Sequence, residues 1–185
     1  MGSASHTKHI LSLSLVSIVL ILLLCMLLNS QTKQNLDCES YDGFTEHQYV
    51  TWEGTEADRL LACWLIKRYI DPKAEIEFVP IGKEIDNVSG IAFDMPGGRW
   101  FRGARQSTSE LIYHEIGIQE NSLDKMIEMV RQLEMAYWMV DPLSEAGRFN
   151  TRLIQVLEQY IDTQERLQGV FAYLDEIYAN GGCLP

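Results

Sequence analysis

The sequence predicts an α+β fold: a small sheet near the front of the chain, packed on a helical bulk and preceded by one N-terminal transmembrane helix. Three observations lead there. A long apolar run occupies residues 10–28, short strand-like segments surround a single helical pattern within residues 47–95, and helical apolar stripes fill residues 108–179. Strands followed by a run of helices are typical of the α+β class.

The N-terminal run Ile10–Leu28 is interrupted only by three serines. Its nineteen positions match the length that a helix needs to cross a hydrocarbon core of about 30 Å. Lys8 precedes it, and Asp37 and Glu39 follow it. Positive residues stay on the cytoplasmic side, so we expect the body to be extracytoplasmic. The predicted organisation is a membrane anchor in residues 1–30, a polar linker in 31–46 and one domain in 47–185.

Two other interpretations of this segment stay open. A cleavable signal peptide requires small residues at its exit, and the sequence there offers Ser30 behind the bulky Leu28. Lipidation at Cys25 would need a small residue before it, where Leu24 stands instead. An uncleaved anchor explains the pattern best.

Net charge limits the classes of binding partner, and the cysteine positions predict a disulfide. The 185-residue chain has a formal net charge of −11, which argues against nucleic acid and against docking on anionic lipid head groups. Cys38 follows the anchor and Cys183 is near the C-terminus. Because chain ends are often close together, these two are predicted to form a disulfide in an oxidising compartment, with Cys63 left as a buried apolar residue.

The front half reads as strand, helix, strand, strand. Residues 47–53 and 75–80 have strand patterns, and 91–95 is a third, shorter strand. Between the first two, residues 56–70 form an amphipathic helix whose continuous run 60–66 indicates burial on more than one side. Asp71-Pro72 ends it, because the residue before proline avoids helical angles.

Four helices are expected in the back half. The first spans about 108–116, is capped by the Ser/Thr cluster at 107–109 and stops at Gly117. The second opens at Asn121 and Ser122, and its apolar stripe is expected to reach Tyr137. The third covers about 146–160. The fourth is capped by Thr163 and ends at Gly181–Gly182.

The loop before residue 108 is the most suggestive local feature. Arg99, Arg102 and Arg105 lie within seven residues and precede Ser107 at a predicted helix start. Backbone N–H groups at a helix N-terminus favour negative charge, and guanidinium groups suit oxyanions. The loop therefore predicts a site for a small oxyanion. The alternative is that these arginines pair with the numerous carboxylates elsewhere in the chain.

A second candidate site consists of Asp58, Arg68 and Asp94. Arg68 falls on the apolar side of its helix, where it must pair with a carboxylate or face a cavity, and the two aspartates are candidate partners. No metal-ligand spacing, phosphate-binding loop or nucleophile elbow occurs, so neither a metal nor a cofactor is predicted. No catalytic residue can be assigned.

Segment DRLLACWLIKRYIDPKAEIEFVP, residues 58–80, resembles the opening of the chromate resistance family, the ChrB C-terminal or chromate resistance exported protein domain. The segment FDMPG at 93–97 resembles that family's P-F-D-x-P-G turn, with Ala92 in place of the proline, and LDEIYA resembles its closing helix. The likeness covers about Tyr49 to Ala179. It implies a role in chromate or other oxyanion resistance.

The chain departs from that pattern where the family carries His and Cys. Ser107 stands about where the family has its cysteine, and Arg131 and Gln132 stand where a His-Asp pair is expected. The departures favour a non-catalytic oxyanion sensor or accessory protein over an enzyme. An enzyme with a divergent Asp/Arg site and a membrane-tethered interaction module remain the alternatives, and a protein partner cannot be named.

Overall fold

The computed structural model describes residues 47–184. The predicted anchor, the linker and Cys38 lie outside these residues, so the membrane prediction stays a prediction. Within residues 47–184 no helix is both long and apolar enough to cross a membrane.

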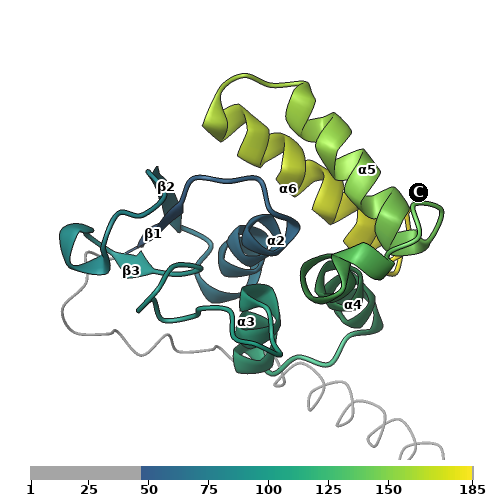
Figure 1. Ribbon diagram of the computed structural model, residues 1–185, viewed down its shortest axis with the longest axis horizontal. Helices are drawn as coiled ribbons and strands as arrows, with labels where there is room; N and C mark the ends of the chain where they lie inside the picture. The colour runs from purple at the N-terminus through teal and green to yellow at the C-terminus, as the bar shows by residue number, and fades with distance from the viewer. Residues whose placement is uncertain (1–46, 185) are drawn as a thin grey trace, which may run out of the picture. The chain divides into compact units, whose positions relative to one another are not determined.

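A three-stranded parallel sheet forms one side of the body (Figure 1). Its strands are β1 (Gln48–Trp52), β2 (Glu75–Val79) and β3 (Ile91–Ala92), in the order β2-β1-β3. Parallel neighbours need a crossover, and helix α2 supplies the one between β1 and β2. The α+β prediction is confirmed for the described residues, and the parallel pairing is what the strand pattern did not reveal.

Helix α2 (Ala57–Leu65) lies in the middle of the body, and every residue of it is buried. It contacts the helices α3 (Thr108–Ile116), α4 (Asn121–Met135) and α6 (Thr163–Ala179). The prediction from the continuous apolar run at 60–66, burial on more than one side, is confirmed. The chain then continues as a five-residue π-helix, Ile66–Ile70, and Asp71 adopts extended angles as the following proline requires.

The back half contains the predicted helices, with two corrections at their ends. Helix α4 stops at Met135, so Tyr137 is not part of its apolar stripe; it belongs to a short 3-10 helix, Tyr137–Met139, and is exposed. Asp162, rather than Thr163, caps α6 by accepting from the amides of Gln164 and Glu165. Local side-chain competition for the same amides decides such caps.

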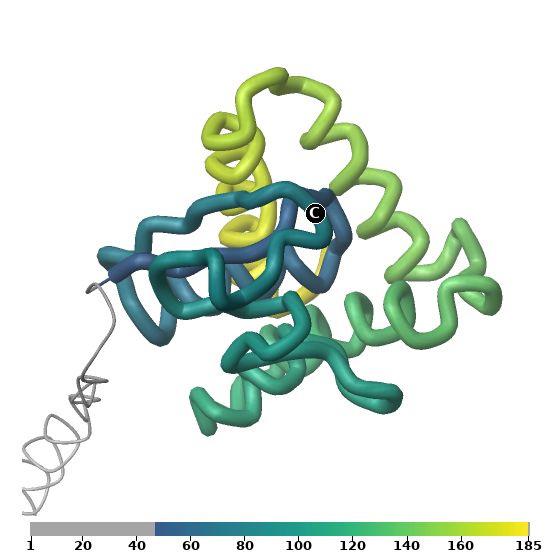
Figure 2. The backbone as a smooth tube through the Cα atoms, turned by 60° about the vertical axis from the view of Figure 1, so that its left-hand side comes forward, coloured from purple at the N-terminus to yellow at the C-terminus, as the bar shows by residue number. Residues whose placement is uncertain are grey.

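Helices α5 (Glu145–Glu158) and α6 lie side by side in both views, joined by a short turn (Figures 1 and 2). A single apolar core joins α2, the sheet and all four later helices; its largest fully buried side chains include Trp64, Phe93 and Phe149. Because α2 is wholly buried and contacts α3, α4 and α6, the segment that carries the first motif is also central to the helical core.

Candidate functional site

The N-terminus of α3 is the point at which distant polar residues converge. Ser107 caps the helix: its hydroxyl accepts from the Glu110 amide, and the Glu110 carboxylate accepts from the Ser107 amide. This reciprocal arrangement is a capping box. Ser107, Thr108 and Ser109 are fully buried, so the predicted Ser/Thr cap forms inside the protein instead of at its surface.

Asp58 of α2 occupies the position where this helix N-terminus would bind an anion. Its Oδ2 accepts from the Thr108 amide at 2.7 Å and its Oδ1 from the Ser109 amide at 2.8 Å. The carboxylate is only 1% exposed. Free N–H groups and the helix dipole both favour negative charge here. The protein therefore satisfies this helix N-terminus with a carboxylate of its own.

Asp94 approaches the same helix from the turn after β3. Its Oδ1 accepts from the Thr108 hydroxyl at 2.7 Å, and its Oδ2 lies 2.8 Å from Nε of Arg59. That N–H is not aligned for a hydrogen bond, so the contact is an ion pair. Burial raises the pKa of Asp94, and the Arg59 charge opposes the rise without cancelling it. Asp94 also has a positive φ of 49°, which Asp tolerates better than most residues.

Arg59 is a member of this cluster that the sequence did not single out. Besides Asp94, its Nη1 donates to the Glu56 carboxylate at 2.6 Å and to the Glu53 carbonyl at 3.1 Å. A helical wheel places it with the polar side of α2, yet it is buried. The apolar run that follows Arg59 could have indicated its burial, because a helix that is buried on all sides also buries its polar residues.

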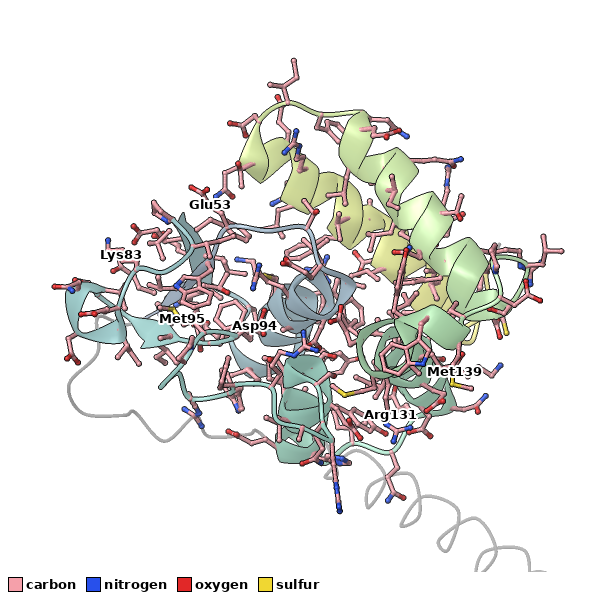
Figure 3. All side chains as sticks on the ribbon, viewed as in Figure 1. Glu53, Lys83, Asp94, Met95, Arg131 and Met139 are labelled. Carbon is pink, nitrogen blue, oxygen red and sulfur yellow. The ribbon has the colours of Figure 1, made fainter. Side chains whose placement is uncertain are left out.

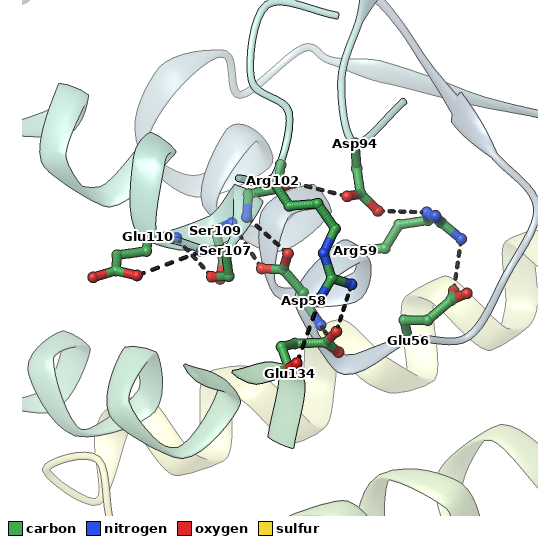
Figure 4. Close-up of polar contacts among 10 residues, drawn as sticks. Glu56, Asp58, Arg59, Asp94, Arg102, Ser107, Ser109, Glu110 and Glu134 are labelled. Atoms are coloured by element: carbon green, nitrogen blue, oxygen red, sulfur yellow. Dashed lines mark hydrogen bonds and ion pairs between the residues drawn. The ribbon is translucent and has the colours of Figure 1, made fainter. Parts of the chain in front are cut away.

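Arg102 joins this network through α4. Its Nη1 donates to the Glu134 carboxylate at 2.9 Å, and Oε1 of that same carboxylate lies 3.4 Å from the Asp58 amide (Figure 4). Burial raises the pKa of Glu134, and the neighbouring Asp58 charge raises it further. Figure 4 shows the resulting chain of contacts among α2, α3, α4 and the arginine loop.

The three arginines of the predicted anion site do not share one partner. Arg99 pairs with Glu115 at 2.5 Å and lies over the Trp100 ring, with 4.6 Å from its Cζ to the ring centroid. Arg102 pairs with Glu134, whereas Arg105 is exposed. Two of the three are thus engaged by carboxylates, as the alternative interpretation of the loop anticipated. Anion binding by the loop stays a prediction.

The second predicted trio is only partly brought together. Asp58 and Asp94 both bind Thr108, but Arg68 lies at the other end of the helical segment and pairs with Asp175. That pair is bidentate, with distances of 3.0 and 2.6 Å, and Asp175 also accepts from the Trp64 indole. The structure therefore assigns Arg68 an ion pair with the aspartate of the closing segment LDEIYA, and not with Asp58 or Asp94.

The remaining titratable groups contribute little to the site. Cys63 is fully buried and burial raises its thiol pKa, so it is not a nucleophile. His47 contacts Asp71 at 2.7 Å. The Cys183 thiol accepts from Lys125; its predicted partner Cys38 is outside the described residues, so the disulfide stays a prediction. Within residues 47–184 no group of three or more His, Cys, Asp or Glu side chains is placed to hold a metal ion.

A groove in the surface lies apart from this network. Its volume is about 530 Å³, and it runs between β2 and α6. Its lining includes Lys67, Glu75, Gln164 and Phe171, and none of the residues that meet at the N-terminus of α3. The buried acid–arginine network is therefore not the wall of this groove.

Comparison with known proteins shows the family to which the chain is related. Residues 49–181 match the family model described as ChrB, C-terminal domain. The chain belongs to the ChrB C-terminal domain family. It is also similar to "Protein ChrB" of Cupriavidus metallidurans, with 24% identity over 145 residues, which cover 78% of this chain and 43% of the relative. The chain thus aligns with less than half of that relative's length. No solved structure matches.

Family membership confirms the resemblance read from the sequence, and the structure explains why its motif residues sit where they do. Asp58 of the first segment and Asp94 of the FDMPG turn both accept from Thr108, at separations of 50 and 14 positions, and Arg59 joins them through Asp94. The two motif segments of this ChrB-family domain are thus parts of one polar cluster that fastens the arginine loop and the start of α3.

Proposed function

We propose that this ChrB-family chain acts in resistance to chromate or a related oxyanion as a non-catalytic sensor or accessory protein, held at a membrane by Ile10–Leu28. The chromate link rests on family membership and the membrane location on the apolar N-terminal segment. Besides the departures at the family's His and Cys positions, the structural observation that supports a non-catalytic role is the engagement of the Asp58 carboxylate. Both its oxygens are taken up by amides of α3 in a buried position, where no substrate reaches them.

Arg102 is the residue through which a bound oxyanion would act. Its side chain is 39% exposed, whereas that of its partner Glu134 is 12% exposed. An oxyanion can therefore approach the guanidinium from solvent and compete with Glu134 for it, and the exposed Arg105 adds a second cation nearby in sequence. Displaced from Arg102, Glu134 would keep only its weak contact with the Asp58 amide. Binding at the loop would in this way reach α4.

This competition gives the proposal a direct test. Sulfate and chromate titrated into the protein should raise its melting temperature, because a ligand that binds only the folded state stabilises it. Arg102→Ala and Arg105→Ala should each reduce the anion-dependent rise. Glu134→Gln should increase it, since Arg102 then has no anionic competitor. Arg148→Ala is the matched control, because Arg148 is exposed on α5 away from the loop.

The wild-type protein allows a second test, because protonation of Glu134 should increase anion binding as Glu134→Gln does. Its raised pKa means that acidification neutralises the competitor of the anion at a higher pH than for an ordinary glutamate. Sulfate should thus stabilise the protein more at mildly acidic than at neutral pH, and Glu134→Gln should abolish that difference. Equal melting temperatures with and without millimolar anion, in both wild type and Glu134→Gln, would overturn the proposal.

A further inference from the structure

Among residues 47–184, the one run of consecutive exposed large apolar side chains follows α4. Tyr137, Trp138 and Met139 are consecutive, and Leu143 comes one turn later; Trp138 is 80% exposed and Leu143 is 81% exposed. We name these four residues the aromatic patch. Figure 3 shows Met139 beside the end of α4, on the far side of the molecule from Lys83 and the sheet. Contiguous exposed apolar side chains of this kind mark an interaction surface.

The patch is held in place by its own backbone. The Met139 amide donates to the Ala136 carbonyl, the Val140 amide to Tyr137, and the amide and hydroxyl of Ser144 both donate to the Asp141 carbonyl. The Leu143 amide donates to the Asp141 carboxylate at 2.8 Å. The turn therefore satisfies these polar groups internally, which a segment must do before it enters an apolar medium.

Close packing behind the turn fixes it further. Gly147 of α5 lies directly against the Asp141 carbonyl and the Pro142 backbone, where an added Cβ would lie 2.3 Å from the carbonyl oxygen. The aromatic patch is accordingly displayed on a supported turn. Exposure of its side chains is thus a feature of the fold at this point.

We propose that the aromatic patch docks on the bilayer surface, with Tyr137 and Trp138 at the level of the lipid head groups and Met139 and Leu143 against the acyl chains. This rests on the proposed membrane anchor. Residues 29–46 separate the end of Ile10–Leu28 from the described domain. Even fully extended, such a segment reaches about 60 Å, so an anchored domain stays close to the membrane.

The chemistry of the patch selects the lipid. Trp and Tyr combine an apolar ring with a polar tip and are enriched at the membrane interface. Within the segment Met135–Ser144 the only charge is Asp141, whose carboxylate already accepts from the turn. With a net charge of −11 the whole chain is repelled by anionic lipids. Zwitterionic phosphatidylcholine is therefore the surface that fits.

The test uses the full chain in phosphatidylcholine nanodiscs that contain lipids labelled with a nitroxide near the head group. Trp138 is the reporter, because Trp64 and Trp100 are buried, Trp52 is half-buried and the predicted anchor contains no tryptophan. Wild-type emission should be quenched by the labelled lipid. Trp138→Phe should lose the quenching, and Trp52→Phe should keep it.

Two further variants separate docking from mere proximity. Leu143→Ser should weaken the quenching of Trp138 because it removes apolar contact with the lipid. Ile161→Ser is its matched control, since Ile161 is even more exposed than Leu143 but lies in the turn between α5 and α6. Replacing part of the phosphatidylcholine with phosphatidylglycerol should also weaken the quenching at low salt.

Outcomes for the anchor and for the patch are distinct. Co-purification with the nanodisc without quenching of Trp138 overturns the docking proposal and leaves the anchor intact. A chain that does not associate with the nanodisc at all overturns both. Emission that is already blue-shifted in detergent, together with dimers that Trp138→Phe dissolves, would show that a second copy of this chain covers the patch instead of lipid.

Discussion

Two arginine–carboxylate contacts at opposite ends of the same helical segment differ in what surrounds them. Arg59 pairs with Asp94 in the interior, next to Asp58 and the start of α3. Arg68 pairs with Asp175 near the surface, with the two side chains 38% and 43% exposed. The first contact belongs to a network in which each carboxylate has several partners. The second is a bidentate pair that water can replace.

The difference teaches how this fold uses charge. A buried charge requires compensation, so the removal of one partner leaves another group unsatisfied. A solvated pair contributes little, because water compensates each partner that is left. The ChrB-family motif at 58–72 contains one arginine of each kind, and only burial distinguishes them.

Asp58→Ala should have the largest effect on stability. It leaves the Thr108 and Ser109 amides without acceptors in a buried position, and we expect a loss of about 3–5 kcal/mol in the free energy of unfolding. Urea denaturation measures it. Asp58→Asn should be less destabilising than Asp58→Ala, since an amide oxygen can still accept from one of the two donors.

The control for this variant is Asp86→Ala, at an exposed position in the short helix Ile85–Asn87, which should change stability by less than about 0.5 kcal/mol. A loss below about 1 kcal/mol for Asp58→Ala would mean that the α3 amides find water instead, and the contrast between interior and surface would collapse.

Arg68→Ala should have a smaller effect, about 1 kcal/mol, because the pair with Asp175 is solvated. Asp175→Ala should be somewhat more destabilising, since the Trp64 indole N–H then also loses its acceptor. A double-mutant cycle between Arg68 and Asp175 isolates the pair. A coupling energy as large as the loss from Asp58→Ala would show that this surface pair behaves like the buried network.

The smallest effect, and the sharpest contrast, is in pH dependence. Burial raises the pKa of Glu134, so the folded protein retains a proton there that the unfolded chain has lost, and stability falls as pH rises past the ordinary range of a glutamate. The bonds from Arg68 lower the pKa of Asp175, so its contribution is present above the ordinary range of an aspartate and disappears as pH falls through the lowered pKa.

Chemical denaturation between about pH 3 and pH 7 distinguishes the two. Glu134→Gln should flatten the decline in stability toward neutral pH, and Asp175→Asn should reduce the loss in acid. Slopes that change in the same direction in both variants would contradict the assignment of opposite environments.

Local patterns in the sequence were enough for much of the fold. Periodicity located the helices 108–116 and 145–158 closely, and Asp71-Pro72 ended the helical segment where it was expected to end. The wrong predictions concern helix ends, which depend on contacts with neighbouring parts of the fold. Tyr137 continues the spacing of α4 but lies beyond its last turn, because periodicity says nothing about where a helix stops packing.

The candidate site shows the same difference between what local patterns predict and what tertiary packing decides. Asp58 and Asp94, both singled out from the sequence, do meet at Thr108, but the arginine beside Asp94 is Arg59 and not the predicted Arg68. Helical angle alone gives the direction of a side chain relative to its own helix, and it cannot say which other elements pack there. Arg59 faces inward because α2 is covered on every side.

The sequence by itself determined the family, the order of strands and helices, and the presence of three motif segments, because these depend on residue types and short spacings. The tertiary structure alone decided which partners meet: Asp58 with α3, Arg102 with Glu134 and Arg68 with Asp175, over separations of 32 to 107 positions. Such contacts follow from the packing of α3, α4 and α6 around α2. No local pattern encodes them, because the partner of a buried charge is set by the elements that enclose it.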